Sequence, residues 1–250
     1  MRKNGIKLIV ALDADTFDEA RILVDSLSPI VDIFKVGSQL FTACGPVIVR
    51  HILARGKKVF LDLKYHDIPN TVANAVSSAV RLNRAVASVL DQEGKKIDPL
   101  GSLFMLTLHL QGGEEMCRAA ADAATKTAQT IGVTRPYIVG ITVLTSQQKE
   151  ANIRHLVLER TALARKAGLD GVVVSSQEAA LVREEFGRDF IIVTPGIRPL
   201  GSEAGDQKRV TTPQEAIKNG SDFLVVGRPI VKASDPVSAA KGILKEIEQA

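Results

Sequence analysis

The sequence predicts an α/β fold, a closed (β/α)₈ TIM barrel of eight parallel strands with the active site at their carboxyl ends. Eight short β-branched runs alternate with helical patterns, and this implies parallel strands because each helix returns the chain to the next strand's start. The length of 250 residues suits a single domain, residues 1–250. An open doubly wound sheet is the alternative, but no glycine-rich turn follows the first strand, where that fold binds dinucleotides.

The strands are expected where short runs rich in β-branched residues occur. In chain order these runs are Lys7–Leu12, Ile33–Val36, Lys58–Leu63, Leu103–His109, Tyr137–Leu144, Gly171–Val174, Phe190–Val193 and Phe223–Val226. Helical patterns alternate with them, near residues 17–27, 46–55, 71–87, 113–130, 147–167, 176–187, 212–219 and 235–248.

Local signals support the helix boundaries. Gly45 and Pro46 open the helix near 46–55, because proline is favoured at the first helical position, and Gly56 closes it. Val72, Val76 and Val80 recur at every fourth position, which predicts an apolar stripe facing the core.

One connection, residues 88–102, is longer than the usual link between a helix and a strand. The alternation puts it on the amino-terminal face of the barrel, away from the expected chemistry. It is interpreted as an extended, solvated surface loop, with an interaction loop as the alternative.

Composition and charge disfavour several classes of protein. The net charge is +4 and the pI about 9.1. Basic residues are spread evenly, so no nucleic-acid-binding face is expected, and the mild positive charge would suit a small anionic substrate. Cys44 and Cys117 lack metal-type or redox-type spacing and are interpreted as free thiols in a reducing compartment. With neither a signal peptide nor a membrane span expected, the sequence indicates a cytoplasmic enzyme.

The most informative stretch runs from Asp62 to Thr71. It places the ammonium of Lys64 between the carboxylates of Asp62 and Asp67, directly after an apolar strand. Side chains alternate along a strand, so Asp62 and Lys64 are expected on the same face. Burying ions is costly unless they are paired, which makes such a cluster a poor core and a good candidate site.

Other candidate site residues also fall at predicted strand ends, where a barrel places its chemistry. They are Asp13, Lys35, His109, Thr145, Pro195, Arg198, Gly227 and Arg228. Asp13 could instead cap a helix, although Asp15 and Thr16 are better placed for that. Thr145 could also be a helix cap, and a structural role is favoured for His109. Lys35 lies inside an apolar strand and therefore needs an anionic partner.

The ends of the seventh and eighth strands suggest a phosphate site, which is the usual phosphate position in barrels. Gly196 and Gly227 permit close backbone approach, while Arg198 and Arg228 can donate charge-assisted hydrogen bonds. The loop 201–209, which contains Gln207, could fold over the site as a lid.

These motifs together resemble one family, the bacterial-type orotidine 5′-phosphate decarboxylases. The resemblance rests on motifs that occur in order along nearly the whole chain: Ala11-Leu12-Asp13, Phe34-Lys35-Val36-Gly37, the decapeptide Asp62–Thr71, Thr142–Ser146, Thr194–Arg198 and Val226-Gly227-Arg228. The decapeptide is highly specific, whereas the final Gly-Arg is weak alone. The long segment 88–102 and the sequence after His109 depart from the family pattern without touching the charged residues.

The resemblance implies a role for each matching residue. Lys64 would donate a proton to C6 of the pyrimidine, and Asp62 would lie beside the substrate carboxylate and hold Lys64 in place. Asp67 and Thr71 would reach across a homodimer interface into the neighbouring subunit's site. The implied substrate-binding residues are Asp13 and Lys35 at the ribose, Ile68, Thr145 at the pyrimidine, and Pro195, Arg198, Gln207, Gly227 and Arg228 around the phosphate or its lid. No metal or cofactor is implied.

This chemistry suits an ammonium group. Loss of carbon dioxide leaves an electron pair at C6 that the ring delocalises poorly, and a fixed ammonium can stabilise that charge and then protonate it.

Two other functions remain open. A related barrel group, the 3-keto-L-gulonate 6-phosphate decarboxylases and hexulose-phosphate synthases, shares an Asp-x-Lys-x-x-Asp pattern but uses magnesium to steady an enediolate. The intact tail from His66 to Thr71 and the pair Arg198 and Gln207 favour the pyrimidine enzyme. A non-catalytic nucleotide-binding barrel is disfavoured because costly charged clusters concentrate in active sites.

Overall fold

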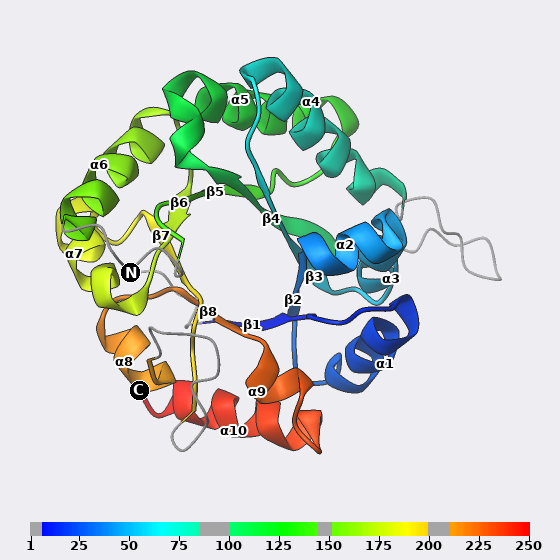
Figure 1. Ribbon diagram of the computed structural model, residues 1–250. Helices are drawn as coiled ribbons and strands as arrows, with labels where there is room; N and C mark the ends of the chain where they lie inside the picture. Colours follow the sequence, from blue (N-terminus) through cyan, green and yellow to red (C-terminus); the bar gives the residue numbers. More distant parts are fainter. Residues whose placement is uncertain (1–6, 86–100, 145–151, 200–210) are drawn as a thin grey trace.

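The eight strands form a closed barrel in which every neighbouring pair is parallel, in the order β1 to β8 with β8 returning to β1 (Figure 1). We describe the protein from a computed structural model, over residues 7–85, 101–144, 152–199 and 211–250. Helices surround the barrel on its outer side. The predicted fold class is therefore confirmed.

The observed strands match the predicted runs closely. They are β1 (Lys7–Ala11), β2 (Ile33–Gly37), β3 (Lys58–Tyr65), β4 (Ser102–His109), β5 (Tyr137–Ile141), β6 (Gly171–Val173), β7 (Ile191–Thr194) and β8 (Phe223–Val226). Two boundaries differ from the prediction by more than one residue. β5 ends three residues before Leu144, and β3 continues to Tyr65, so that Lys64 belongs to the strand.

The helices also follow the predicted pattern, except that the helix expected near 71–87 ends at Val80 and is followed by a 3₁₀ turn. They are α1 (Phe17–Leu27), α2 (Ser38–Cys44), α3 (Pro46–Ala54), α4 (Pro69–Val80), α5 (Gly113–Ile131), α6 (Ile153–Lys166), α7 (Ser176–Phe186), α8 (Pro213–Lys218), α9 (Arg228–Val231) and α10 (Pro236–Glu248), with short 3₁₀ turns η1 (Arg81–Ala85) and η2 (Leu110–Gly112). The short helices α2 and α9 were not predicted. Each has at most two turns, too few for a periodic apolar pattern to stand out.

Capping residues explain where several helices begin. Thr16 caps α1 by accepting a hydrogen bond from the backbone N–H of Glu19, so Asp13 is left for another role, as expected. Pro46 opens α3 as predicted, after Gly45 with φ of 59°. The predicted stripe of α4 is confirmed, since Val72, Val76 and Val80 are all buried there.

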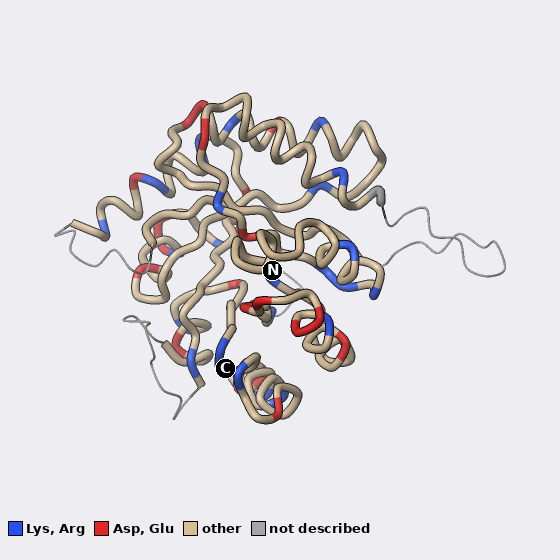
Figure 2. Tube along the Cα trace, turned by 45° about the vertical axis from the view of Figure 1, so that its right-hand side comes forward, with Lys and Arg blue, Asp and Glu red and all other residues tan. Residues whose placement is uncertain are grey.

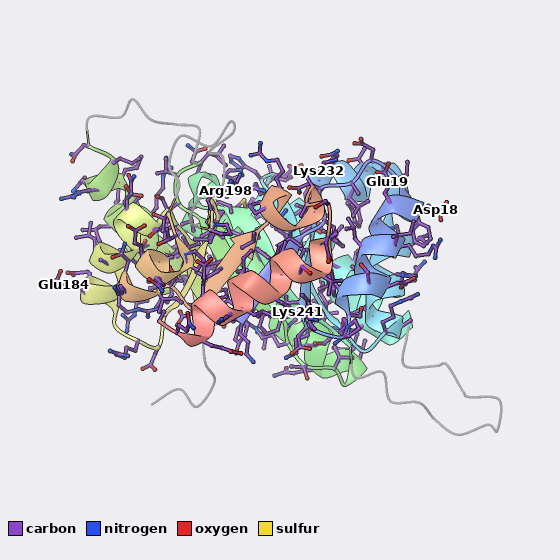
Figure 3. All side chains as sticks on the ribbon, turned by 90° about the horizontal axis from the view of Figure 1, so that it is seen from below. Asp18, Glu19, Glu184, Arg198, Lys232 and Lys241 are labelled. Carbon is purple, nitrogen blue, oxygen red and sulfur yellow. The ribbon has the colours of Figure 1, made fainter. Side chains whose placement is uncertain are left out.

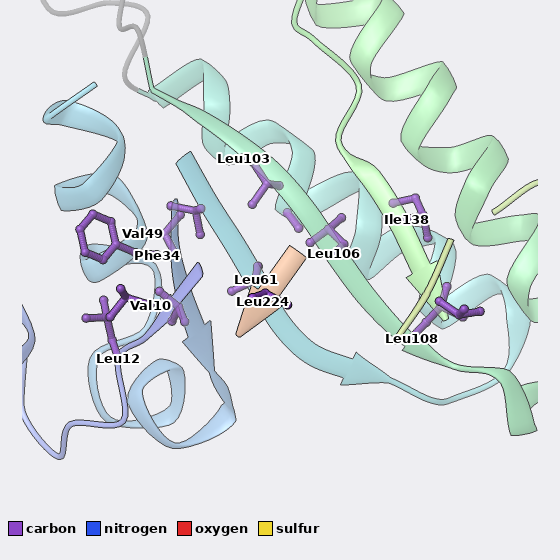
Figure 4. Close-up of a cluster of buried hydrophobic side chains, with 14 of the residues drawn as sticks. Val10, Leu12, Phe34, Val49, Leu61, Leu103, Leu106, Leu108, Ile138 and Leu224 are labelled. Carbon is purple, nitrogen blue, oxygen red and sulfur yellow. The ribbon is translucent and has the colours of Figure 1, made fainter. Parts of the chain in front are cut away.

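Apolar side chains pack in two layers. The larger lies between the strands and the helices; Figure 4 shows part of it, with Phe34, Val49 and Leu61 among the labelled residues. The smaller fills the barrel interior, and its members are Ile9, Ala11, Ile33, Phe60, Met105, Val139, Ile191, Val193, Phe223 and Val225. They alternate along the strands with residues of the outer layer, as the strand period requires.

Charged residues of both signs are distributed over the described part of the trace (Figure 2). Both cysteines are free, and burial raises the pKa of the Cys117 thiol to about 12. Within the described ranges, no helix is both long and apolar enough to cross a membrane. Residues 88–100 of the predicted surface loop lie outside the described residues, and the assignment of 1–250 to one domain stays a prediction.

Candidate active site

Four charged side chains form a connected row, called here the charged chain, across the carboxyl ends of β1, β2 and β3. They are Asp13, Lys35, Asp62 and Lys64. The ammonium of Lys64 lies 2.8 Å from Oδ2 of Asp62, and that of Lys35 lies 3.6 Å from the same oxygen. Lys35 also lies 3.8 Å from Oδ1 of Asp13, which follows β1. The charges therefore alternate in sign from Asp13 to Lys64, and the anionic partner expected for Lys35 is present twice.

Strand alternation explains why these residues meet. Along β3, Phe60 belongs to the interior layer, and Asp62 continues the same face toward the carboxyl end. Ile33 and Lys35 repeat this arrangement on β2. The interior thus changes from apolar to charged within two residues along each strand, which places the charges on top of a packed core.

The backbone of Lys64 is unusual. Its φ of 52° is the only positive value at a non-glycine residue in the described ranges. Leu61 pairs with Leu106 and Tyr65 with Leu108, so three residues of β3 face a single residue of β4. This bulge places Lys64 in the left-handed region, which costs about 1–2 kcal/mol, and such conformations cluster at functional sites.

Thr107 on β4 is the residue that faces this bulge, and sequence reasoning missed it. Its hydroxyl accepts a hydrogen bond from the backbone N–H of Lys64 and donates one to Oδ1 of Asp62, each at 2.9 Å. The side chain is fully buried. A signal was present, because Thr107 is a polar residue two positions after Met105 on the inward face of an otherwise apolar strand.

Asp62 is the most buried member of the charged chain, with 8% of its surface exposed. Burial alone would raise the pKa of its carboxyl group. The ammonium groups of Lys35 and Lys64, with hydrogen bonds from Lys64 and Thr107, reverse that effect and hold the pKa below its ordinary value. Asp62 is therefore an ionised carboxylate at neutral pH.

A pocket of about 230 Å³ opens above these residues. Its charged lining consists of Asp13, Lys35, Asp62, Lys64, Arg198 and Arg228. Its apolar lining comes from Ala11, Phe60, Ile141, Val143, Leu144, Val173 and Val225, with Pro195, Gly196 and Gly227 completing the wall. A concave site with an apolar wall and a few convergent charges is the usual form of a small-molecule site.

The arginine side of the pocket matches the predicted phosphate site. Arg198 follows β7 and is 7% exposed, although its charged group borders the pocket; Figure 3 places it at the same end of the molecule as Lys232. Its backbone N–H donates to the carbonyl of Thr211 at 2.9 Å, and Ile197 forms a parallel bridge with Thr211. These contacts join the segment after β7 to the residues just before α8.

Gly227 gives the pocket wall room for a carboxylate. A Cβ atom at this position would lie 2.9 Å from Oδ2 of Asp13. Glycine is therefore needed for Asp13 to keep its present position beside Lys35.

Three predicted site residues lie outside this pocket. Asp67, Ile68 and Thr71 are exposed, and Ile68 is a large apolar side chain with 65% of its surface exposed. The carboxylate of Asp67 accepts a hydrogen bond from the backbone N–H of Ile68 at 2.6 Å. Within a single chain, the fold does not bring these three residues to Lys64. Thr145 and Gln207 lie outside the described residues, so their roles stay predictions.

His109 lies near the site without lining the pocket. Its ring stands 5.5 Å from that of His66. Burial, together with the charges of His66 and Lys64, lowers the pKa of His109, so its imidazole is neutral at pH 7. This environment is compatible with the structural role favoured from the sequence.

Comparison with known proteins identifies the family. A model of the orotidine 5′-phosphate decarboxylase / HUMPS family matches residues 6–243. The chain belongs to this family. The resemblance inferred from the motifs is therefore confirmed, and it extends over almost the full length of the chain.

Individual members of the family are similar over their whole length. The orotidine 5′-phosphate decarboxylase of Moorella thermoacetica is 47% identical over 251 residues, which cover 97% of this chain and 92% of that protein. The decarboxylase of Geotalea daltonii is 45% identical over 249 residues, 96% of this chain and 95% of the relative. A crystal structure of the Lactobacillus acidophilus enzyme superposes with a TM-score of 0.78 at 33% identity, covering 97% of this chain and 99% of the other.

Proposed function

We propose that this protein converts orotidine 5′-phosphate to UMP and carbon dioxide, the last reaction of de novo pyrimidine nucleotide synthesis, without a metal or cofactor. The observation that carries the proposal is the ammonium of Lys64 held 2.8 Å from Asp62 in the lining of the pocket. Relatives that match nearly the whole chain are named orotidine 5′-phosphate decarboxylase.

The charge of the pocket supports an anionic substrate. Four cationic side chains and two carboxylates line it among the described residues, which gives a net charge of +2. Orotidine 5′-phosphate carries a phosphate dianion at one end and a carboxylate at the other. Lys64 lies on β3, whereas Arg198 and Arg228 follow β7 and β8, so different parts of the barrel wall would offer one positive region to each end.

The chemistry at Lys64 follows from this placement. The bond between C6 and the carboxylate breaks, carbon dioxide leaves, and the electron pair stays on C6. The ammonium stabilises that pair and transfers one proton to C6, forming UMP. The neutral amine then takes a proton from solvent. Asp62, an ionised carboxylate in contact with Lys64, fixes the direction of the ammonium.

The rest of the pocket would bind the remaining parts of the substrate. Asp13 and Lys35 would hydrogen-bond the ribose hydroxyls, and Pro195 and Gly227 would border the phosphate held by the arginines. Phosphate binding far from the broken bond can still raise the rate, because its binding energy orders the site around the reacting carbon.

We infer a homodimer in which Asp67, Ile68 and Thr71 enter the partner's pocket. Their exposure supports this, since Ile68 is a large apolar residue with 65% of its surface exposed and therefore available to a partner. A two-fold axis would make the exchange reciprocal, with each subunit completing the other's site.

Mixed dimers test this inference. Lys64→Ala and Asp67→Ala subunits are each expected to be inactive alone. After mixing and exchange, one site of each mixed dimer would contain both native residues, so activity should return to about one quarter of the parent value. Absence of any recovery despite subunit exchange, measured with differently tagged chains, would contradict a shared site.

The family also includes the HUMPS proteins by its description, so a magnesium-dependent phosphosugar reaction is the second candidate. The charges around Asp62 disfavour it. Two ammonium groups lie within 3.6 Å of its Oδ2, where they would repel a divalent cation.

The assay that separates the two candidates follows the absorbance of orotidine 5′-phosphate in excess chelator. We expect full turnover there, and none from Lys64→Ala protein purified in parallel, which controls for contaminating host enzyme. Turnover that disappears with chelator and returns with magnesium would overturn the proposal.

We also infer a cytoplasmic location, where free thiols such as Cys44 stay reduced.

A further inference from the structure

The hydroxyl of Thr107 occupies the gap that the bulge opens between β3 and β4. Asp62, Leu63 and Lys64 lie between the paired residues of β3, whereas Thr107 alone lies between those of β4. On the β4 side, these three residues of β3 therefore face one residue, whereas on the other side Asp62 is still in register with Gly37 of β2. The fully buried side chain of Thr107 leaves no room for water to replace those contacts.

The chemistry of its partners fixes the direction of both hydrogen bonds. The backbone N–H of Lys64 can only donate, so Oγ1 of Thr107 accepts there. An ionised carboxylate can only accept, so the single hydroxyl proton goes to Oδ1 of Asp62. One hydroxyl thus bridges the main chain of Lys64 and the side chain of Asp62.

This bridge acts on both members of the Lys64–Asp62 pair. It holds Lys64 at a φ of 52°, a conformation that needs support from its surroundings. It also engages Oδ1 of Asp62, so that Oδ2 is the oxygen facing the ammonium groups of Lys64 and Lys35. Both residues of the 2.8 Å contact are therefore hydrogen-bonded to Oγ1 of Thr107, Lys64 through its main chain and Asp62 through its carboxylate.

We propose that Thr107 is a positioning residue for the decarboxylation, whose hydroxyl sets where the Lys64 ammonium stands relative to C6. This inference rests on the proposed function. Thr107 itself does not line the pocket and touches the reaction only through Lys64 and Asp62.

The test compares Thr107→Val, which keeps the shape and loses the hydroxyl, with Thr107→Ser, which keeps the hydroxyl. For Thr107→Val we expect kcat to fall about 10- to 100-fold, because small displacements of a reacting group have effects of that size. KM and the Kd of UMP should stay within about threefold of the parent values, since the arginines are untouched. Thr107→Ser should restore kcat to within about threefold.

Three results would overturn the proposal: an unchanged kcat in Thr107→Val, a Thr107→Ser variant as impaired as Thr107→Val, or a loss of UMP affinity as large as the loss of kcat. If Thr107→Val does not fold, Thr107→Ala against Thr107→Ser gives the same comparison. Failure of the proposed function shows separately, as a parent protein without decarboxylase activity. The distance from Lys64 Nζ to Asp62 Oδ2 in crystals of Thr107→Val, expected to lengthen, tests the positioning without any turnover.

Discussion

Two lysines on the same strand show how differently the two ends of the barrel are built. At the start of β3, the ammonium of Lys58 lies 5.4 Å from the centre of the Phe104 ring. Phe104 in turn contacts Tyr137 and Phe223 edge to face, at 5.3 and 5.5 Å between ring centres. At the other end of β3, the ammonium of Lys64 lies 2.8 Å from the carboxylate of Asp62.

The amino-terminal end of the barrel therefore contributes mainly to stability, and we call it the stable end. The carboxyl end holds the groups proposed for the chemistry, and we call it the reactive end. The amino-terminal end buries apolar side chains such as Met105 and Phe223, each of which stabilises the fold by removing area from water. The carboxyl end instead holds buried ions and a left-handed lysine, features that oppose folding unless neighbouring groups compensate them. Because both ends use the same strands, the stable end can offset the cost of the reactive end.

The largest expected effect breaks the reactive end. Under the proposed mechanism, Lys64→Ala removes both the stabilising charge and the proton donor, so kcat should fall by at least about 10⁴-fold. UMP should still bind, because the phosphate region is intact. Lys58→Ala is the matched control on the same strand, and its kcat should stay within about twofold of the parent. Near-normal turnover by Lys64→Ala would refute the assignment of the proton donor.

The next effect breaks the stable end. Phe223→Ala removes a ring that packs against Phe104 in the barrel interior. The lost burial together with the cavity should lower the free energy of unfolding by about 3–5 kcal/mol. Urea unfolding followed by circular dichroism measures this loss, and Phe223→Leu should lose less. The kcat of the folded protein should barely change. A large loss of kcat with unchanged stability would show that the two ends are not separate.

The same contrast explains what the sequence could predict. Strand alternation was enough to bring Asp62 and Lys64 to one face, and the order of strands was enough to gather Arg198 and Arg228 at one side of the pocket. Thr107 escaped because a threonine in a strand is ordinary, and only the register between β3 and β4 shows that it faces a bulge. Asp67 lies outside the pocket of its own chain, and in the proposed homodimer its place depends on a second subunit, which the pattern of one chain does not describe.

A smaller effect is expected at the phosphate region. Arg228→Ala should weaken substrate capture by about 2–5 kcal/mol if a buried charge pair with phosphate is lost, seen as a raised KM and a raised Kd for UMP. Lys232→Ala is the control, since Lys232 is exposed, four residues away and outside the pocket. Equal effects of the two changes would indicate general electrostatic attraction rather than a specific contact.

Gly227→Ala tests the fit of the pocket wall. The added methyl group would lie 2.9 Å from Oδ2 of Asp13, and this carboxylate is free to rotate away. Substrate binding should therefore weaken by about 1–3 kcal/mol, while the melting temperature changes little. Asp13→Asn keeps the size of the side chain but removes its charge. Its effect on substrate binding shows how much of the loss in Gly227→Ala is caused by displacement of the Asp13 carboxylate. A fall in melting temperature without a change in KM would mean that the methyl group disturbs the fold instead.

The smallest effect concerns the backbone of Lys64 itself. Lys64→Gly and Lys64→Ala both remove the ammonium, but only glycine adopts a φ of 52° without steric conflict. Lys64→Gly should therefore be more stable than Lys64→Ala by about 1 kcal/mol, although glycine also loses more chain entropy on folding. Paired urea titrations of the two inactive variants measure this difference. If Lys64→Gly were the less stable of the two, the left-handed conformation would impose no net cost, and the carboxyl end would not be the strained end of the barrel.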